Sequence, residues 1–195
     1  MKGGLVVMLG ALQALTTLGR LEGRPVTVVL AGDEEIGSPA SGELVRAEAE
    51  ECALALAFEC GRPAEGGATT IVTARRGVGR FALRASGRAG HSGSAAEPPA
   101  SAIVEIAAKV GPMTALTDAT RGWSVNVGVL RGGTAANVVA AAAEALVDYR
   151  FWDLASGADL SERLVELATE AAVRAADGRH LVRTRVHDHL VRPPL

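Results

Sequence analysis

Apolar residues in the first part of the chain come in long runs that polar turns separate. The run PVTVVLAG at 25–32 is continuous and rich in β-branched residues, which is typical of a strand covered on both faces. Ser38 and Pro39 have the form of an N-cap followed by a first helical position. The predicted elements are a mostly buried helix at 4–18, a strand at 25–32, a helix at 39–51 and a buried strand at 52–59. This alternation favours a mainly parallel α/β sheet.

After the first 73 residues, apolar and polar residues alternate with a period of two. Segments such as RRGVGRFALRASG at 75–87 alternate apolar and polar residues, as half-exposed strands do. The predicted elements are a strand at 75–87, a helix at 99–110, strands at 123–133 and 143–152, a helix at 157–176 and a strand at 179–187. The order β-α-β-β-α-β is the ferredoxin-like arrangement. We therefore expect an α/β segment at 1–73 and a ferredoxin-like domain at 74–187.

Composition narrows the class of protein. Of 195 residues, 48% are hydrophobic and the formal net charge is −2, so the chain can bury a core and has no electrostatic case for nucleic acid or an anionic membrane. Aromatic residues make up only 3%, which argues against base-stacking surfaces. Cys52 and Cys60 form no zinc-type cluster, which fits a reducing, cytoplasmic setting. Residues 4–18 also resemble a signal peptide, but Gln13 and Thr16 interrupt the run and favour a buried helix.

Four acids follow the ends of the two predicted buried strands. Asp33, Glu34 and Glu35 come after the first strand, and Glu59 closes the second. Parallel α/β sheets bind ligands at the carboxyl ends of their strands, so these carboxylates are candidates for holding a hard or borderline cation. The alternative is that acids before a helix simply favour its dipole. That explanation covers one or two of them and fits Glu59 poorly.

Histidines provide the other candidate chemistry. His91 lies in the segment GRAGHSG, where a lone loop histidine is most often a solvated side chain. A Ser92 nucleophile elbow is disfavoured because Ser94 stands where the motif needs glycine. His187 and His189 would share one face of a strand, and solvated or structural roles suit them better than a metal site.

Six segments occur in the same order as in a known enzyme family. They are MKGGLVVMLGALQAL, VVLAGDEEIGSPAS, ALAFECGRP, RRGVGRFALRASGRAGHSG, VNVGVLRGGTAANVV and AEALVDYRFW. The chain thus resembles the di-zinc metallopeptidase and aminoacylase family, which includes glutamate carboxypeptidase, acetylornithine deacetylase and succinyl-diaminopimelate desuccinylase. The resemblance implies a zinc-dependent hydrolase of amide bonds in N-acyl amino acids or dipeptides, closest to glutamate carboxypeptidase. It also implies a homodimer formed through the second domain, with two Zn²⁺ per complete site that Co or Mn could replace.

The same resemblance assigns roles by position. Glu34 matches the general base, and Glu35 and Glu59 each match a ligand of one zinc ion. His91 matches a histidine that reaches across the dimer and stabilises an oxyanion. Two further residues match those that hold the substrate's carboxylate end, namely Asn137 and Arg150. From its own residue type alone, Arg150 would be a plain surface arginine on a strand.

The family pattern extends beyond this sequence on both sides. Family members carry a metal-bridging aspartate and an H-x-D motif before the equivalent of Met1, and a further histidine in a later half. Residues 188–195 match the segment that returns to the catalytic domain. Because each zinc then keeps one of its three protein ligands, we expect a catalytically incomplete chain. The alternative is a non-catalytic dimerisation module derived from the same family.

Overall fold

A computed structural model describes residues 2–59, 66, 70–93, 99–174 and 179–195. The chain divides into two compact units, Met1–Val72 and Thr73–Leu195. No helix among the described residues has both the length and the apolar character needed to cross a membrane.

The first unit contains helices but no described strand. Its elements are α1 (Lys2–Thr17), the short 3-10 helix η1 (Glu34–Ile36) and α2 (Gly42–Glu50). Helices therefore occur close to both predicted positions. The predicted burial of the first helix is wrong, because α1 buries none of its residues.

The strands predicted at 25–32 and 52–59 are not formed among the described residues, and the parallel sheet expected there is wrong. Both segments run extended without a hydrogen-bonded neighbour, and their side chains are open to solvent: Val26 is 52%, Leu30 70% and Leu54 73% exposed. A strand needs a partner that takes up its backbone N–H and C=O groups. An apolar run alone cannot supply that partner.

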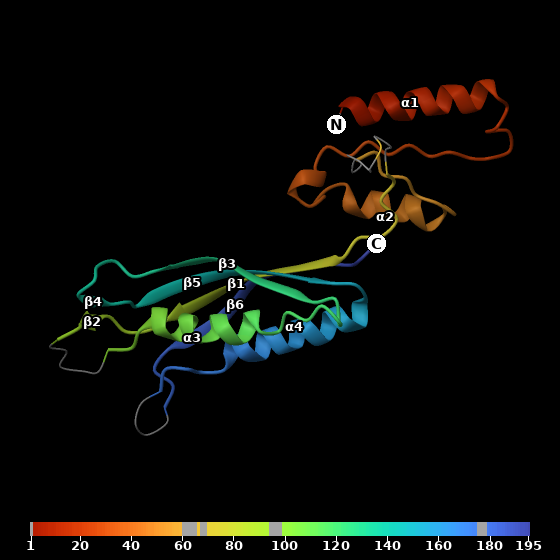
Figure 1. Cartoon of the computed structure of the whole chain (residues 1–195). Coiled ribbons are helices and arrows are strands. Elements are labelled where there is room, and N and C mark those ends of the chain that lie inside the picture. Colours follow the sequence, from red (N-terminus) through yellow and green to blue (C-terminus); the bar gives the residue numbers. More distant parts are fainter. Residues whose placement is uncertain (1, 60–65, 67–69, 94–98, 175–178) are drawn as a thin grey trace. The chain divides into compact units, whose positions relative to one another are not determined.

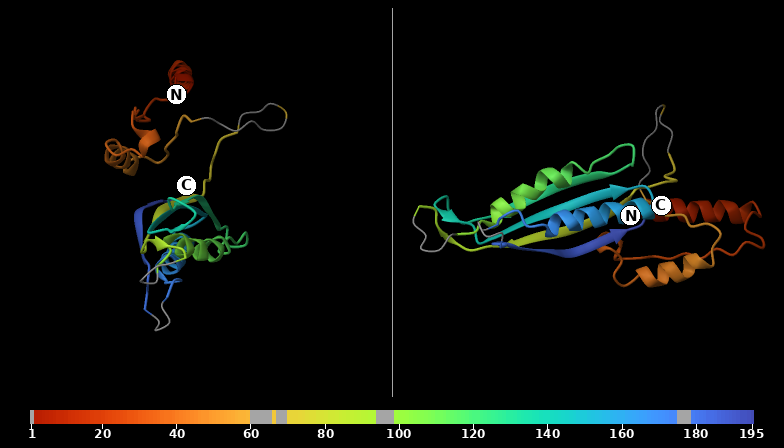
Figure 2. Two further views of the ribbon diagram at one scale, coloured as in Figure 1. Left: turned by 90° about the vertical axis from the view of Figure 1, so that its left-hand side faces the viewer. Right: turned by 90° about the horizontal axis from the view of Figure 1, so that it is seen from below.

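The second unit is a four-stranded antiparallel sheet with two helices (Figures 1 and 2). The sheet has the order β3-β5-β1-β6, and β2 pairs with β4 in a separate two-stranded ribbon. The elements are β1 (Gly77–Ser86), β2 (Gly90–His91), α3 (Ala102–Thr114), β3 (Ser124–Gly132), β4 (Val138–Val139), β5 (Ala142–Phe151), α4 (Leu154–Thr169) and β6 (Arg183–Arg192). The long elements follow the predicted order β-α-β-β-α-β.

Alternation along the two central strands explains how the core forms. In β5, buried residues at every second position face α3 and α4, which lie side by side on one face of the sheet (Figure 1). The opposite face carries the polar positions of the same strands. The largest fully buried side chains are Leu83, Ile106, Met113, Tyr149, Phe151, Leu160 and Leu164.

Aromatic rings in the core lie over glycines of the neighbouring elements. Tyr149 and Gly79 are directly opposite each other in the register of β5 and β1. A Cβ atom at Gly79 would stand 1.9 Å from the ring of Tyr149, so only glycine leaves room for that ring. Phe151 lies in the same way over Gly77 and Gly157. Glycine is therefore required here for space and not for backbone conformation.

A buried ion pair joins the two helices of the second unit. Glu105 of α3 is fully buried, and its carboxylate lies 3.1 Å from the ammonium of Lys109 one turn later. The same carboxylate accepts hydrogen bonds from the backbone N–H groups of Ala172 and Val173, just after α4. Lys109 in turn donates to carbonyls at the end of α4, among them that of Leu167 at 3.1 Å. The pair thus caps the C-terminus of α4 and fixes the chain that leaves it.

Candidate functional site

The ribbon of β2 and β4 brings two predicted site residues together. His91 pairs with Val138 in the ribbon, and the backbone N–H of Ser92 donates to the carbonyl of Asn137 at 3.1 Å. His91 and Asn137 are far apart in sequence, and both are exposed at the tip of the second unit. The local pairing of two short segments therefore creates this candidate site.

Hydrogen bonding sets the orientation of the His91 ring. The backbone N–H of Gly93 donates to Nδ1 of His91 at 3.1 Å. Since Nδ1 acts as an acceptor, the neutral ring carries its proton on Nε2. That N–H is a donor suited to an oxygen that develops negative charge. Because the ring bonds to Gly93, the alternative of a Ser92 nucleophile gains no support.

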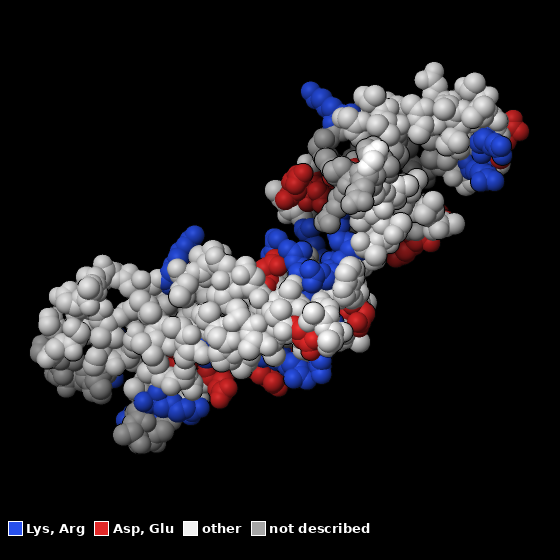
Figure 3. Space-filling view, in the orientation of Figure 1, with Lys and Arg blue, Asp and Glu red and all other residues white. Residues whose placement is uncertain are grey.

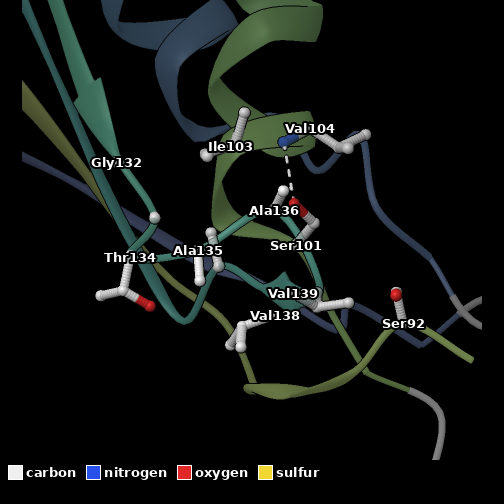
Figure 4. A pocket seen from close by; sticks show the side chains of 12 residues that line it. Ser92, Ser101, Ile103, Val104, Gly132, Thr134, Ala135, Ala136, Val138 and Val139 are labelled. Atoms are coloured by element: carbon white, nitrogen blue, oxygen red, sulfur yellow. Dashed lines mark hydrogen bonds between the residues drawn. The ribbon is translucent and has the colours of Figure 1, made fainter. Parts of the chain in front are cut away.

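A hollow of about 570 Å³ lies beside the ribbon (Figure 4). Small and apolar side chains line most of it, and its polar groups are hydroxyls and backbone. At its floor, Ser101 caps α3 by accepting a hydrogen bond from the N–H of Val104 at 3.3 Å. The residues that border it include Ser92, Ser101, Ile103, Thr134, Val138 and Val139. None of the described residues that line this hollow is acidic or basic, so it suits contact with another apolar surface better than acid–base chemistry.

The visible surface around the ribbon carries few charged side chains (Figure 3). Exposed large apolar side chains in this region include Val104 of α3 at 56% and Leu130 of β3 at 50%. Uncharged surface with exposed aliphatic residues is typical of protein–protein contact.

Arg150 lies at the other end of the sheet and is held by an acid. Its Nε and Nη2 donate to the two carboxylate oxygens of Asp148 at 2.8 and 3.1 Å. Arg80 reaches the same carboxylate, with Nε 2.8 Å from Oδ2. Arg150 is therefore a positioned guanidinium and not a free surface arginine. Partial burial of Asp148 opposes ionisation, but the hydrogen bonds from Arg150 and Arg80 outweigh it and hold the pKa of Asp148 below its ordinary value.

The depressed pKa of Asp148 predicts a specific loss of stability in acid. Its folded pKa lies below its unfolded pKa, so the carboxylate stabilises the fold above about pH 4 and loses this effect as the pH falls through the folded pKa. Unfolding midpoints in urea, followed by tryptophan fluorescence, are expected to fall more steeply in acid for the natural chain than for Asp148→Asn. Identical acid profiles for the two proteins would show that Asp148 is not involved.

The predicted carboxylates of the first unit do not form a metal centre within the described residues. Glu34 and Glu35 lie in η1, and Glu59 follows an extended segment; all three side chains are exposed. Among the described residues, no group of three or more His, Cys, Asp and Glu side chains could hold a metal ion. Stable zinc sites take three or four protein ligands. The described residues therefore do not by themselves fit the di-zinc centre.

Asp33 holds the turn that precedes α2. Its carboxylate accepts a hydrogen bond from the Ser41 hydroxyl, and also from the backbone N–H groups of Ala40 and Ser41 at 2.8 and 3.0 Å. These bonds hold the pKa of Asp33 below its ordinary value. Asp33 thus fixes the turn before α2, which agrees with the helix-dipole explanation for one of the acids.

The histidines of β6 differ from the prediction that they share a face. Asp188 between them has a φ of 53°, and the pairing of β6 with β1 shifts register there. His187 consequently lies opposite Ala82, whereas His189 turns toward α4 and hydrogen-bonds the hydroxyl of Tyr149 at 2.9 Å. A β-bulge reverses the alternation of side chains, and no sequence signal marked it.

Comparison with known proteins identifies the family to which this fold belongs. Residues 73–176 match the peptidase dimerisation domain of the M20 family. The chain belongs to this family.

Among characterised relatives, carboxypeptidase G2 from Pseudomonas sp. (strain RS-16) is 29% identical over 150 residues, which cover 77% of this chain. The match spans about a third of that protein, 35% of its length. The family predicted from the six sequence segments is confirmed.

Solved structures agree with this assignment. The aminobenzoyl-glutamate utilization protein from Klebsiella pneumoniae is similar with a TM-score of 0.53 and 25% identity, over 61% of this chain and 29% of that one. A tripeptidase from Staphylococcus aureus has a TM-score of 0.51 at 17% identity, over 64% of this chain and 31% of that one. The second likeness shows a shared fold only.

Proposed function

We propose that the second unit joins two copies of this protein and carries His91 and Asn137 to the active site of the partner copy. The whole protein would be a zinc-dependent hydrolase of amide bonds in N-acyl amino acids or dipeptides, of the glutamate carboxypeptidase type. The observation that carries this proposal is the position of the candidate residues at opposite ends of one sheet.

The separation of these residues is too large for one small substrate. Arg150 lies near the end of β5, whereas His91 and Asn137 lie in the ribbon beyond Ala142, where β5 begins. Eight positions along a strand span about 26 Å, whereas a dipeptide extends about 7 Å. A substrate held by Arg150 of one copy can therefore meet His91 only if that histidine comes from another copy.

Between the two edges of the sheet, β3 is better suited than β6 to pair with a second copy. The edge strand β6 carries Arg183, Arg185, Asp188 and Arg192, and such charges protect an edge from pairing. The sequence of β3, SVNVGVLRG, has a single charge. Leu130 of β3 and Val104 of the neighbouring α3 are exposed, and the hollow, whose described lining carries no charge, lies beside them. We infer an antiparallel contact between two β3 strands, extended by α3.

Replacing Leu130 and Val104 together with aspartate tests this contact. Placing carboxylates at the centre of an apolar interface leaves charges without partners, so the dimer dissociation constant is expected to rise by roughly 100-fold or more. Native mass spectrometry of the full chain measures the dimer fraction across concentrations and reports any bound zinc in the same spectrum.

The matched control is Leu190→Asp on the opposite edge, where Leu190 is similarly exposed. It is expected to leave the dimer intact. Dimer loss in the control but not in the Leu130 and Val104 variant would place the contact on β6 and refute the proposal. A natural chain that remains monomeric at all concentrations would refute it as well.

The roles of the acids in the first unit are proposed from the resemblance to the family. Glu35 and Glu59 are the candidate ligands of two zinc ions, and Glu34 is the candidate general base.

The strand order β3-β5-β1-β6 supports describing the second unit as ferredoxin-like. The alternative is a non-catalytic dimerisation module, and it is compatible with the finding that the described residues hold no group of three or more His, Cys, Asp and Glu side chains able to bind a metal. Zinc retained by the intact chain in the mass spectrum would contradict that alternative.

A further inference from the structure

The register of the sheet collects arginines on the face opposite α3 and α4. Residues that are directly opposite in neighbouring strands point to the same face. Arg84 of β1 is opposite Arg185 of β6 on one side and Glu144 of β5 on the other, and Glu144 is opposite Arg131 of β3. One row across all four strands therefore reads arginine, arginine, glutamate, arginine. The sequence pattern of single strands does not reveal this row.

Part of this charge is balanced by acids on the same face. Arg80 and Arg150 share Asp148, and Arg84 contacts Glu144 at 2.7 Å and Asp188 at 3.8 Å. The same register also places Arg183 and Arg192 on this face. Within the described part of the chain, no carboxylate forms an ion pair with Arg131, Arg183, Arg185 or Arg192. Among the described residues of this face, seven arginines thus stand against three carboxylates, on a protein whose net charge is −2.

The cationic face is locally unfavourable for the fold. Like charges directly opposite on neighbouring strands destabilise a sheet, and Arg84 and Arg185 form such a pair. Residues that break such a rule of strand pairing are expected where their side chains serve a function such as binding. Carboxylates of a binding partner would remove this repulsion and satisfy the unpaired guanidinium groups.

The centre of the face is largely apolar and slightly hollowed. Ala82 and Leu146 border a depression of about 330 Å³, and Arg80, Asp148 and Asp188 also line it. In the register, Leu190 is opposite Arg80 and His187 is opposite Ala82. An apolar centre with a charged rim is the usual anatomy of a protein interface. The register places no Phe, Tyr or Trp on this face among the described residues, so it lacks the stacking surfaces that bind single-stranded nucleic acid.

We propose that the open face of the sheet, centred on Leu146 and rimmed by Arg131, Arg183 and Arg185, binds an acidic polypeptide segment that also carries aliphatic side chains. Its carboxylates pair with these three arginines, which have no ion pair among the described residues, and its aliphatic groups cover the central depression. This surface lies on strands that do not include His91 or Asn137, so binding there is separate from the proposed role of the ribbon. Arg150, proposed above to hold the substrate, lies on the same face but is not one of the three arginines assigned to the partner.

Fluorescence anisotropy of the full chain with a labelled peptide of repeating Glu-Glu-Leu tests this surface. The variant R131Q/R183Q/R185Q removes three unpaired charges and is expected to weaken binding roughly 10-fold at low salt, because each lost pair contributes a modest amount. Added salt is expected to weaken binding of the natural chain and to narrow the difference between the two proteins. Circular dichroism checks that the variant keeps its fold.

The matched control is R20Q/R24Q/R46Q, which removes the same charge from exposed positions in the first unit. It is expected to bind the peptide as the natural chain does. Equal weakening in both variants would show that net charge alone attracts the peptide and would overturn the proposal, as would unchanged binding in the first variant. Tighter binding of duplex DNA than of the peptide would also overturn it, because the partner would then be a nucleic acid.

Discussion

Replacing Glu105 with alanine is expected to lower the free energy of unfolding by about 3–5 kcal/mol. The substitution leaves the ammonium of Lys109 buried without its carboxylate, and it removes the acceptor for the N–H groups of Ala172 and Val173. Urea denaturation followed by tryptophan fluorescence measures the change. Both tryptophans, Trp123 and Trp152, lie in the second unit, so this signal reports on that unit alone.

A double-mutant cycle separates the ion pair from general disruption. Lys109→Met alone leaves the Glu105 carboxylate buried without its countercharge, whereas Glu105→Leu with Lys109→Met leaves no buried charge. The double variant is therefore expected to lose less stability than the sum of Glu105→Leu and Lys109→Met. Strict additivity would mean that the two side chains act independently and that the pair does not hold α3 against α4.

Replacing Gly79 with alanine is expected to destabilise the second unit by about 3 kcal/mol, at the upper end of the range for overpacking. The new methyl group would overlap the ring of Tyr149, which is fully buried and cannot swing into solvent. Displacing the ring also breaks its hydrogen bond to His189. The urea midpoint and the near-ultraviolet circular dichroism of the tyrosine are both expected to change.

Gly128→Ala is the matched control, since Gly128 is also in a strand. A Cβ atom there meets only the flexible side-chain amide of Asn126, at 3.1 Å. This variant is expected to stay within about 0.5 kcal/mol of the natural chain. If both alanine variants were equally stable, the ring of Tyr149 would have room to move, and the requirement for glycine would be wrong.

The order of elements in the second unit could be predicted from sequence because each segment carries its own period. Alternation identified β1 and β5, and helical spacing identified α3 and α4. Helix ends were less accurate: α4 begins at Leu154 because the side chain of Asp153 accepts from the N–H of Ser156. Capping hydrogen bonds decide where a helix begins, and the spacing of its apolar residues does not reveal them.

Strands in the first unit could not be predicted in the same way, because an apolar run and a parallel strand look identical in sequence. The run at 25–32 has the right composition but lacks a hydrogen-bonded neighbour among the described residues. Pairing is a property of the whole sheet and not of one segment. The short β2 and β4 strands were missed for the opposite reason, since two residues are too few to show any period.

Candidate site residues followed from the family resemblance more than from physical pattern. The resemblance selected His91 and Asn137, and the ribbon brings them together. It also selected Arg150, whose bidentate contact with Asp148 could have been suspected from their spacing of two along a strand. The bulge at Asp188 and the arginine row across the sheet depend on register, which single-strand patterns do not contain.

The unpaired apolar segments of the first unit also bear on how the protein behaves at high concentration. Residues 25–31 and 53–58 are extended, uncharged and rich in valine, leucine and alanine, and no described strand pairs with them. Such stretches can stack in register with identical stretches of other molecules and form cross-β fibrils. Aggregates formed on storage are therefore expected to have a core built from the first unit, while the sheet of the second unit stays native.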